Sequence, residues 1–465
     1  MTDKAITIWQ ELGFCSTPYH THPLKPTDDD VLLHVARTRE SAEFLTQIEH
    51  VGGGITIISG DVGLGKTSFL NVHQRLLAAN QAGVALRLLI NHDITGVTAD
   101  DTAESLARHL TFNLVSSIVK ECVAKQQPVP KEAERIQKWM SHESKRSHVG
   151  GSIQILGSGF SAEHGSSETP IDDMRLENWK NILGLLVAEA KTCLGLHGVI
   201  IAIDNTETLP IDELVKILMS YRDTLFVVDD IWWIIIGRKN LYSQIANRDP
   251  RVSQRILGSG IELRPLNSEE LHELVEKRIR GLRIDSPGRK KPAKSPLSPQ
   301  IHKLLYAASC GQPRYMLKAA DDLFRAILVD VRIKLTKENQ GLLGSGMINK
   351  ALRSELVDDQ VPDTLAEPML RKRAIDALRS RGLSDIQVNA LRIVAASGPT
   401  QVEARAKAGR GSRATDEALA LLEAADLIVK IEQLGGSRHV LKGDAWICNH
   451  YGDWNKLSGP VDTLL

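Results

Sequence analysis

Residues 54–67 read GITIISGDVGLGKT, and the fold of this chain can be predicted from them. The uninterrupted apolar run Gly54–Ser59 predicts a buried strand, and the sequence from Thr67 onward predicts a helix. Between them, residues 60–67 fit the pattern G-x-x-x-x-G-K-[ST] at every fixed position. Such a loop wraps phosphates with its backbone N–H groups, and the helix N-terminus adds positive potential. We therefore predict a P-loop nucleotide-binding fold with ATP and Mg²⁺ as cofactors.

The loop gives individual residues chemical roles. We expect Lys66 to reach the β- and γ-phosphates of ATP and the Thr67 hydroxyl to bind Mg²⁺. A chance glycine-rich turn is the alternative, and the flanking strand and helix argue against it. The predicted nucleotide contacts are Gly60, Asp61, Val62, Gly63, Leu64, Gly65, Lys66, Thr67 and Ser68.

A second apolar strand supplies a carboxylate for the metal. Residues 199–204 read VIIAID, and we expect Asp204, at the end of a strand next to the first one, to hold Mg²⁺ together with Thr67. A strand-end Asp that only caps a turn is the alternative. The residue that usually follows is a Glu that polarises the attacking water, but here it is Asn205. Either Glu207 substitutes for that Glu, or hydrolysis is slow.

Apolar strands alternate with helical segments, which predicts an α/β fold with a parallel five-stranded sheet. The predicted strands are 54–59, 84–91, 199–203, 231–236 and 261–266. Helices are predicted from Thr98 as N-cap to about Val123, over Trp179–Leu194, and from Ser268 to Leu282 without a full capping box.

Composition marks the remaining boundaries. We predict a lead-in segment at 1–50, an ATPase core at 51–282, a helical lid and linker at 283–360, and a last unit at 383–450. The core carries an insertion at about 124–173, rich in Gly and Ser, in which Ile153, Ile155 and Leu156 predict one short hairpin. The Pro- and Lys-rich stretch 283–300 predicts a solvated loop, with DNA-backbone contact as the lesser reading. A linker containing Pro362 and Pro368 is expected before the last unit.

The last unit resembles a winged helix-turn-helix of the MarR type. Helices are predicted near Ile386–Val394, at 400–408 and at 413–425, followed by a hairpin around Gly435-Gly436. In such a fold the third helix lies in the major groove of DNA. The alternative is a winged helix used for protein contacts. The predicted DNA contacts are Lys407, Arg410, Arg413 and Arg438, with Arg405 and Lys442 as further phosphate partners.

Bulk properties limit the partners. Lys plus Arg and Asp plus Glu are both 57, so the formal net charge is zero and any basic surface must be local. Aromatic residues make up 4%, so stacking on bases is not a dominant theme. The 5 cysteines are scattered without a CxxC pair, which argues against disulfides or zinc. The N-terminus lacks a signal-peptide core, and the longest apolar run, Ile231–Gly237, is too short for a bilayer, so we expect a cytoplasmic protein.

Around the loop, the chain resembles an AAA+ ATPase of the origin-recognition or initiator type, a group close to the ATPases of secretion and transposition systems. The resemblance covers about residues 10–325. Leu12-Gly13-Phe14, Pro18-Tyr19 and Pro23-Leu24, followed by Arg37-x-x-Glu40, are similar to the lead-in that lies against adenine in relatives. That likeness implies a nucleotide contact for Arg37.

Three further segments carry the resemblance. Residues 233–240 are similar to the sensor-1 strand, which implies a role near the γ-phosphate for Arg238 or Asn240. Residues 249–256 are similar to the segment with the arginine finger, so Arg251 or Arg255 would reach a neighbouring subunit's γ-phosphate. Gly311-Gln-Pro-Arg314 resembles sensor 2, whose arginine contacts phosphate in its own subunit. Edge-of-sheet and solvated side chains are the plain alternatives for these residues.

The resemblance implies an ATPase that oligomerises with shared ATP sites and binds double-stranded DNA in an ATP-dependent way. It allows another protein of the same system as a further partner and implies no membrane. Replication, transposition, mobile elements and defence are all compatible contexts. The alternative is a STAND-like signalling switch, which Asn205 and the Gly-x-Pro of residues 311–313 favour. It would hydrolyse ATP slowly and use the winged helix for protein contacts.

Overall fold

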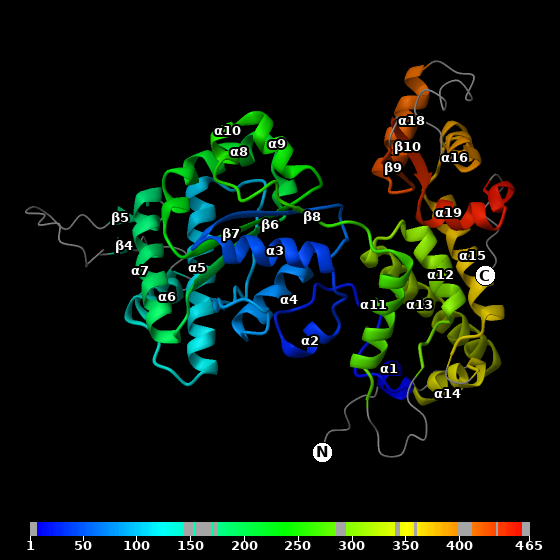
Figure 1. The fold of residues 1–465 in the computed structure, drawn as a ribbon. Coiled ribbons are helices and arrows are strands. Elements are labelled where there is room, and N and C mark those ends of the chain that lie inside the picture. Colours follow the sequence, from blue (N-terminus) through cyan, green and yellow to red (C-terminus); the bar gives the residue numbers. More distant parts are fainter. Residues whose placement is uncertain are drawn as a thin grey trace, which may run out of the picture. The chain divides into compact units, whose positions relative to one another are not determined.

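The computed structural model describes residues 7–143, 152–153, 169–170, 174–284, 294–339, 345–357, 360–397, 412–433 and 436–457. By contacts the chain forms two compact units (Figure 1). Pro23–Arg264 is one unit, which we call the nucleotide unit. Met1–His22 with Pro265–Leu465 is the other, which we call the C-terminal unit. The predicted lead-in is therefore divided between the two units.

A parallel sheet forms the centre of the nucleotide unit. Its strands run in the order β2 (Leu88–Leu89), β6 (Gly198–Asp204), β7 (Ile231–Gly237), β1 (Gly54–Ser59) and β8 (Ile261–Glu262), and β3 (Thr95–Gly96) also pairs with β6. Because β2 and β3 both pair with β6, they occupy one edge position in two pieces, and the predicted five-stranded parallel sheet is confirmed. The edge strands are shorter than the predicted 84–91 and 261–266.

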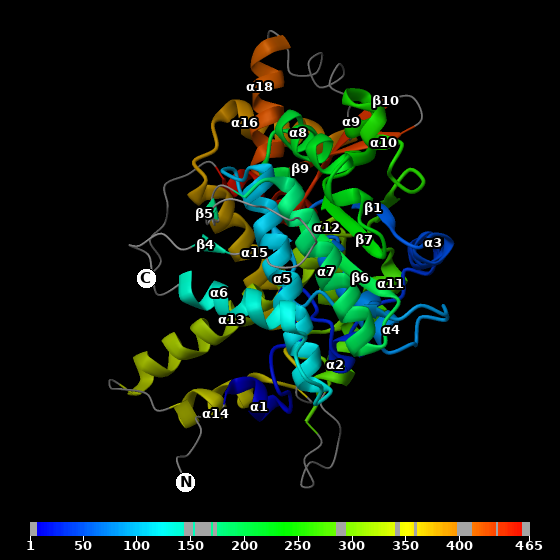
Figure 2. The same cartoon turned by 90° about the vertical axis from the view of Figure 1, so that its left-hand side faces the viewer.

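Side chains on the two faces of the sheet enter separate cores, as the period of two in a strand requires. Ile57 and Ile201 face α5 (Ala103–Ala124), α6 (Lys131–Glu143), α7 (Leu176–Leu194), α8 (Ile211–Arg222) and α9 (Leu241–Arg248). Ile58 and Ile200 face α3 (Thr38–His50) and α4 (Lys66–Ala78). α5 and α7 lie side by side over the first face (Figures 1 and 2). Burial on both faces explains the continuous apolar runs of β6 and β7.

Two local predictions in this unit need correction. The helix expected to start at Thr98 is α5, whose N-cap is Thr102, with its side chain accepting from Ser105 N. Thr98 instead bonds Asp101 in the preceding turn. The predicted insertion begins with α6, whose Ala133 and Ile136 are buried in the main core. β4 (Ser152–Ile153) pairs with β5 (Thr169–Pro170), whereas Ile155 and Leu156 lie outside the described residues.

The first part of the C-terminal unit is helical. It comprises α1 (Ile8–Leu12), α11 (Ser268–Gly281), α12 (Pro299–Ser309), α13 (Pro313–Asn339), α14 (Ser345–Glu355) and α15 (Asp363–Ser380). Trp9 of α1 stacks on Phe324 of α13 with ring centroids 4.6 Å apart. α11 has the capping box that the sequence was expected to lack, because its N-cap is Asn267, paired with Glu270. The expected linker is the helix α15, with Pro368 inside it, since burial of its apolar face outweighs the proline.

The winged-helix prediction is met where the chain is described. α16 (Asp385–Ser397), α18 (Ser412–Ala424), β9 (Ile428–Gln433) and β10 (Gly436–Leu441) enclose one apolar core, completed by α19 (Gly443–His450). β9 and β10 pair antiparallel as the predicted hairpin. The predicted helix 400–408 lies outside the described residues. The shorter elements of the chain are α2 (Asp28–Leu32), α10 (Pro250–Ser253) and the 3-10 turns Thr206–Thr208, Leu225–Val227 and Asp453–Lys456. None of the helices in the described part of the chain has the length and apolarity to cross a bilayer.

Candidate nucleotide-binding site

The phosphate loop joins β1 to α4 with backbone conformations that need glycine. Gly60, Gly63 and Gly65 have φ values of 150°, 86° and 87°. A Cβ on Gly60 would lie 2.9 Å from the carbonyl oxygen of Leu263, which is backbone and cannot move aside cheaply. Gly65 is the N-cap of α4 and supplies no capping side chain, so the first amides of α4 are left to a ligand. An anion fits this arrangement.

Lys66 spans the loop. Its ammonium donates to the carbonyl oxygens of Gly60 at 2.9 Å and Asp61 at 3.1 Å, and the residue is only 8% exposed. A cation held beside the loop in this way fits the phosphates of a nucleotide.

Thr67 and Asp204 meet directly. The Thr67 hydroxyl donates to Oδ2 of Asp204 at 2.7 Å, although the two residues are 137 positions apart in the chain. The expectation that Asp204 ends a strand next to β1 is wrong, because β7 lies between β1 and β6. α4 bridges the gap, since it starts at the carboxyl end of β1 and carries Thr67 toward β6. A hydroxyl and a carboxylate at this spacing suit Mg²⁺, which takes few protein ligands and completes its shell with phosphate oxygens and water.

The turn after Asp204 is held firmly on both sides. Asn205 is left-handed, with a φ of 57°, and opens the 3-10 turn that contains Glu207. The buried Thr206 hydroxyl donates to the Ile236 carbonyl oxygen of β7 at 2.9 Å, and Thr208 donates to Val97 at 2.8 Å. One carboxylate oxygen of Glu207 is buried without a hydrogen-bond partner. An acceptor of this kind is suited to take a hydrogen bond from a bound water.

The candidate sensor residues follow β7. Because β7 lies between β1 and β6, its carboxyl end lies between the phosphate loop and Asp204. Arg238 is exposed directly after the strand, and Asn240 is the left-handed N-cap of α9, with a φ of 63°. Both lie at the edge of the sheet where sensor 1 was predicted.

Arg37 and Ser68 bind the chain's own backbone. Arg37 is 3% exposed, and its guanidinium donates to the carbonyl oxygens of Leu64 at 2.9 Å and Arg264 at 2.6 Å. The Ser68 hydroxyl accepts from the Leu24 amide at 3.0 Å. These contacts place both residues beside the loop, and the nucleotide contact predicted for them stays a prediction. The sequence carried no signal for this beyond the spacing of the lead-in.

The remaining arginines are exposed. Arg251 lies in α10, whose N-cap Asp249 binds the amides of Arg251 and Val252, and Arg255 follows α10. Arg314 lies in the first turn of α13, in the C-terminal unit. Exposure is required of Arg251 or Arg255 if either is to reach another subunit, whereas the contact predicted for Arg314 lies within its own subunit.

The structure describes half of the predicted DNA contacts. Arg438 is exposed on β10 of the wing. Arg413 is exposed on α18 and pairs with Glu417 at 3.0 Å, so its charge is partly neutralised within the helix. Lys442 was predicted to meet phosphate, but it is 3% exposed, pairs with Asp426 and lies 5.5 Å from the centre of the Tyr315 ring. Lys407 and Arg410 lie outside the described residues.

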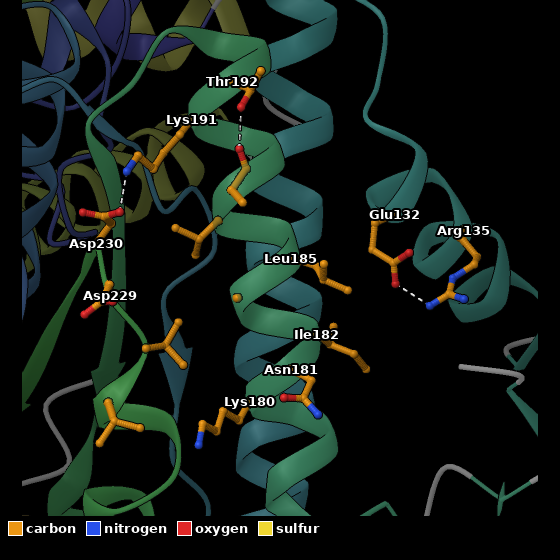
Figure 3. A pocket seen from close by; sticks show the side chains of 15 residues that line it. Glu132, Arg135, Lys180, Asn181, Ile182, Leu185, Lys191, Thr192, Asp229 and Asp230 are labelled. Atoms are coloured by element: carbon orange, nitrogen blue, oxygen red, sulfur yellow. Dashed lines mark hydrogen bonds and ion pairs between the residues drawn. The ribbon is translucent and has the colours of Figure 1, made fainter. Parts of the chain in front are cut away.

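A separate pocket lies on the outer surface of α7 (Figure 3). Its volume is about 660 Å³, and its walls come from α6, α7 and residues 227–230. Lys191 pairs with Asp230 at one side and Arg135 pairs with Glu132 at the other. Residues 227–230 precede β7, so the pocket lies toward the amino end of that strand and the phosphate loop lies at the carboxyl end of the sheet. It is distinct from the nucleotide site.

Comparisons with known proteins bear on the fold. No protein-family model and no curated protein matches the chain. Similar solved structures include the ORC2 protein of Aeropyrum pernix in ADPNP–ADP complexes, at 13% identity over 96% of this chain and 98% of that chain, with a TM-score of 0.45. The ORC1 protein of the same organism, in complex with DNA, is 13% identical over 92% and 96%, with a TM-score of 0.37. A RuvB variant of Thermotoga maritima is 11% identical over 90% and 95%, with a TM-score of 0.37.

Initiator proteins thus stand among the structures that this chain is similar to, as the sequence resemblance predicted, at low identity. The strand order is a property of the sheet itself and does not depend on these matches. In this sheet β7 lies between β1, which leads into the phosphate loop, and β6, which ends at Asp204. This strand order is typical of AAA+ P-loop ATPases.

Proposed function

We propose that this protein is an AAA+ ATPase that binds ATP with Mg²⁺ and hydrolyses it. The observation that carries the proposal is the 2.7 Å contact between Thr67 and Asp204. The complete phosphate loop is one indication of nucleotide binding. The second is that the fold brings a hydroxyl and a carboxylate from distant segments together at the end of this loop. Bound Mg²⁺ would neutralise charge on the β- and γ-phosphates.

Each residue of the site has a part in the proposed chemistry. Lys66 binds the β- and γ-phosphate oxygens, and the loop amides bind the rest of the phosphate chain. Thr67 and Asp204 hold the metal. Glu207 takes the place of the missing acid at position 205 and orients the attacking water, which its buried, unpartnered oxygen is suited to do. Arg238 or Asn240 contacts the γ-phosphate from the end of β7.

The proposal is tested by Lys66→Ala, with Lys120→Ala as the matched control. Lys120 pairs with Asp93 on the surface of the same unit. We expect Lys66→Ala to weaken ATP binding sharply or to abolish turnover, and Lys120→Ala to leave both at parental values. ATP titration followed by a turnover assay measures the two quantities. Equal affinity and turnover in the parent and a folded Lys66→Ala protein would falsify the assignment of the loop.

We further propose that ATP sites are shared between copies of the chain. Arg251 and Arg255 are exposed beside a short capped helix, so they are available to a neighbour's γ-phosphate. Turnover per molecule should then rise with protein concentration. Mixing the Arg251→Ala/Arg255→Ala protein with the Lys66→Ala protein should restore part of the activity through hybrid sites. Concentration-independent turnover without restoration in the mixture argues against shared sites.

We propose that the winged helix binds double-stranded DNA, in a manner controlled by ATP. The exposed Arg438 on the wing supports this proposal. The rival function is a STAND-like switch, and two observations favour it. Asn205 replaces the usual acid, and Glu417 pairs with Arg413 on α18, the helix predicted to enter the major groove. DNA titration with and without ATP, repeated across salt concentrations, separates the two. Salt-sensitive binding supports the first, and its absence in every nucleotide state supports the second.

A further inference from the structure

The chain passes between its two compact units twice, at His22–Pro23 and at Arg264–Pro265. On the nucleotide-unit side, side chains hold Leu24, the second residue after the first passage, and Arg264, the last residue before the second. These side chains belong to the phosphate-binding helix or also bind the phosphate loop. We call these two places the first and second connection.

The first connection is held by α4. The Leu24 amide donates to the Ser68 hydroxyl at 3.0 Å, and the Leu24 carbonyl oxygen accepts from the Asn71 amide nitrogen at 2.8 Å. Ser68 and Asn71 are three positions apart and so lie on one face of the helix that starts with Lys66 and Thr67. Leu24 is 4% exposed and Asn71 is 9% exposed, so water competes poorly for these hydrogen bonds. Both backbone groups of Leu24 are therefore fixed to the phosphate-binding helix.

The second connection is held by Arg37. One nitrogen of its guanidinium donates to the Arg264 carbonyl oxygen, and the other donates to the carbonyl oxygen of Leu64 in the phosphate loop. The guanidinium is planar and its donors have a fixed spacing, so a shift of one carbonyl is passed to the other. Glu40, itself 3% exposed, keeps the group in place from 3.8 Å and also lies 3.6 Å from Nε of Arg264.

The positions of the partners of Arg37 support a role beyond satisfying a buried charge. A buried arginine that only satisfied Glu40 could point at any nearby carbonyl, but Arg37 joins the loop that grips phosphate to the last residue of the unit. Ser68 and Asn71 join Leu24 to α4, the helix whose first residues are Lys66 and Thr67.

We propose that Arg37 is a positioning residue that, with Ser68 and Asn71, ties both connections to the phosphate-binding element, so that binding of a nucleoside triphosphate fixes the two connections. The inference rests on the proposed function, since it needs ATP to bind the loop. Phosphates engage the amides that follow Leu64 and the first turn of α4. With the phosphates bound, the loop holds Arg264 through Arg37. The helix α4 holds Leu24 through Ser68 and Asn71.

Hydrogen–deuterium exchange with and without ATP and Mg²⁺ tests the proposal on the full chain. We expect ATP to slow exchange in peptides covering residues 22–26 and 262–266. Arg37→Lys keeps the charge beside Glu40 but replaces the rigid, planar guanidinium with a single ammonium on a flexible stem, which does not hold two carbonyls at a fixed spacing. Slowing at 262–266 should therefore be weakened, and slowing at 22–26 kept. Ser68→Ala should show the reverse pattern. Each protein is compared at ATP concentrations that saturate it, so a change in affinity does not imitate the effect.

Arg39→Lys is the matched control, because Arg39 is exposed and pairs with Glu43 along the same helix. It should respond to ATP as the parent does. If the parent binds ATP but neither connection responds, or if Arg37→Lys and Ser68→Ala both respond like the parent, the coupling is refuted while the proposed ATPase stands. If a separate ATP titration finds no binding to the parent, both proposals fall. If Arg37→Lys does not fold, Ser68→Ala decides alone, since it removes one hydroxyl.

Discussion

A single added methyl group at Gly237 should destabilise the nucleotide unit and slow turnover. Gly237 is the last residue of β7, between the phosphate loop and the turn that follows Asp204. A Cβ there would lie 2.5 Å from Cδ2 of Leu241 and 2.5 Å from the hydroxyl oxygen of Thr206. That hydroxyl is the one that binds the Ile236 carbonyl oxygen and holds the turn in place.

The magnitude follows from these two contacts. Overfilling a packed core costs about 1–3 kcal/mol, and the end of the Leu241 side chain can absorb part of the strain. Displacing the Thr206 hydroxyl from its buried acceptor adds about 1 kcal/mol. We therefore expect Gly237→Ala to lower the free energy of unfolding by roughly 2–4 kcal/mol. At about 2–4 °C per kcal/mol for a domain of this size, the Tm should fall by roughly 4–16 °C.

Gly184→Ala is the matched control with the opposite sign. Gly184 lies inside α7, and a Cβ there would meet nothing within 4 Å. Removing a mid-helix glycine should raise the free energy of unfolding by about 0.5–1 kcal/mol. Urea unfolding gives both values, and a turnover assay should show Gly237→Ala slowed more than its ATP affinity is weakened. If Gly237→Ala is as stable as the parent, or no less stable than Gly184→Ala, the described packing at the end of β7 is incorrect.

Three further outcomes are expected. Burial lowers the pKa of His73 and of His302 to about 4, so both imidazoles are neutral in the folded protein near neutral pH. The unfolded chain binds protons at these residues below about pH 6.5, so the free energy of unfolding should fall as the pH is lowered from about 6.5 to 4. Urea unfolding measures it, and a flat profile would contradict this. Arg371→Met should lower the free energy of unfolding of the C-terminal unit by roughly 1–3 kcal/mol, because it removes a hydrogen-bonded partner of the buried Asp453 carboxylate; unchanged thermal unfolding would show the pair to be dispensable. Arg438→Ala should flatten the slope of log DNA affinity against log salt by about one unit, and an unaltered slope would move the phosphate contact elsewhere.

The local structure of the candidate nucleotide site could be predicted from neighbouring residues alone. Glycines at 60, 63 and 65, followed by Lys66 and Thr67, specify a loop through local backbone geometry, which neighbouring residues alone can encode. The apolar runs of β6 and β7 likewise predicted strands buried on both faces, because a strand buried on both faces is apolar at nearly every position. The wing hairpin followed from the same kind of local pattern.

Which of these elements meet could be seen only in the folded chain. The strand order places β7 between β1 and β6, and α4 delivers Thr67 to Asp204 across that gap. Arg37 showed itself as a bridge between Leu64 and Arg264 only once the chain had folded, and the buried oxygen of Glu207 depends on how the turn packs. The physical reason is range: periodicity and turn chemistry act over a few residues, whereas strand order and buried hydrogen bonds join segments far apart in the chain.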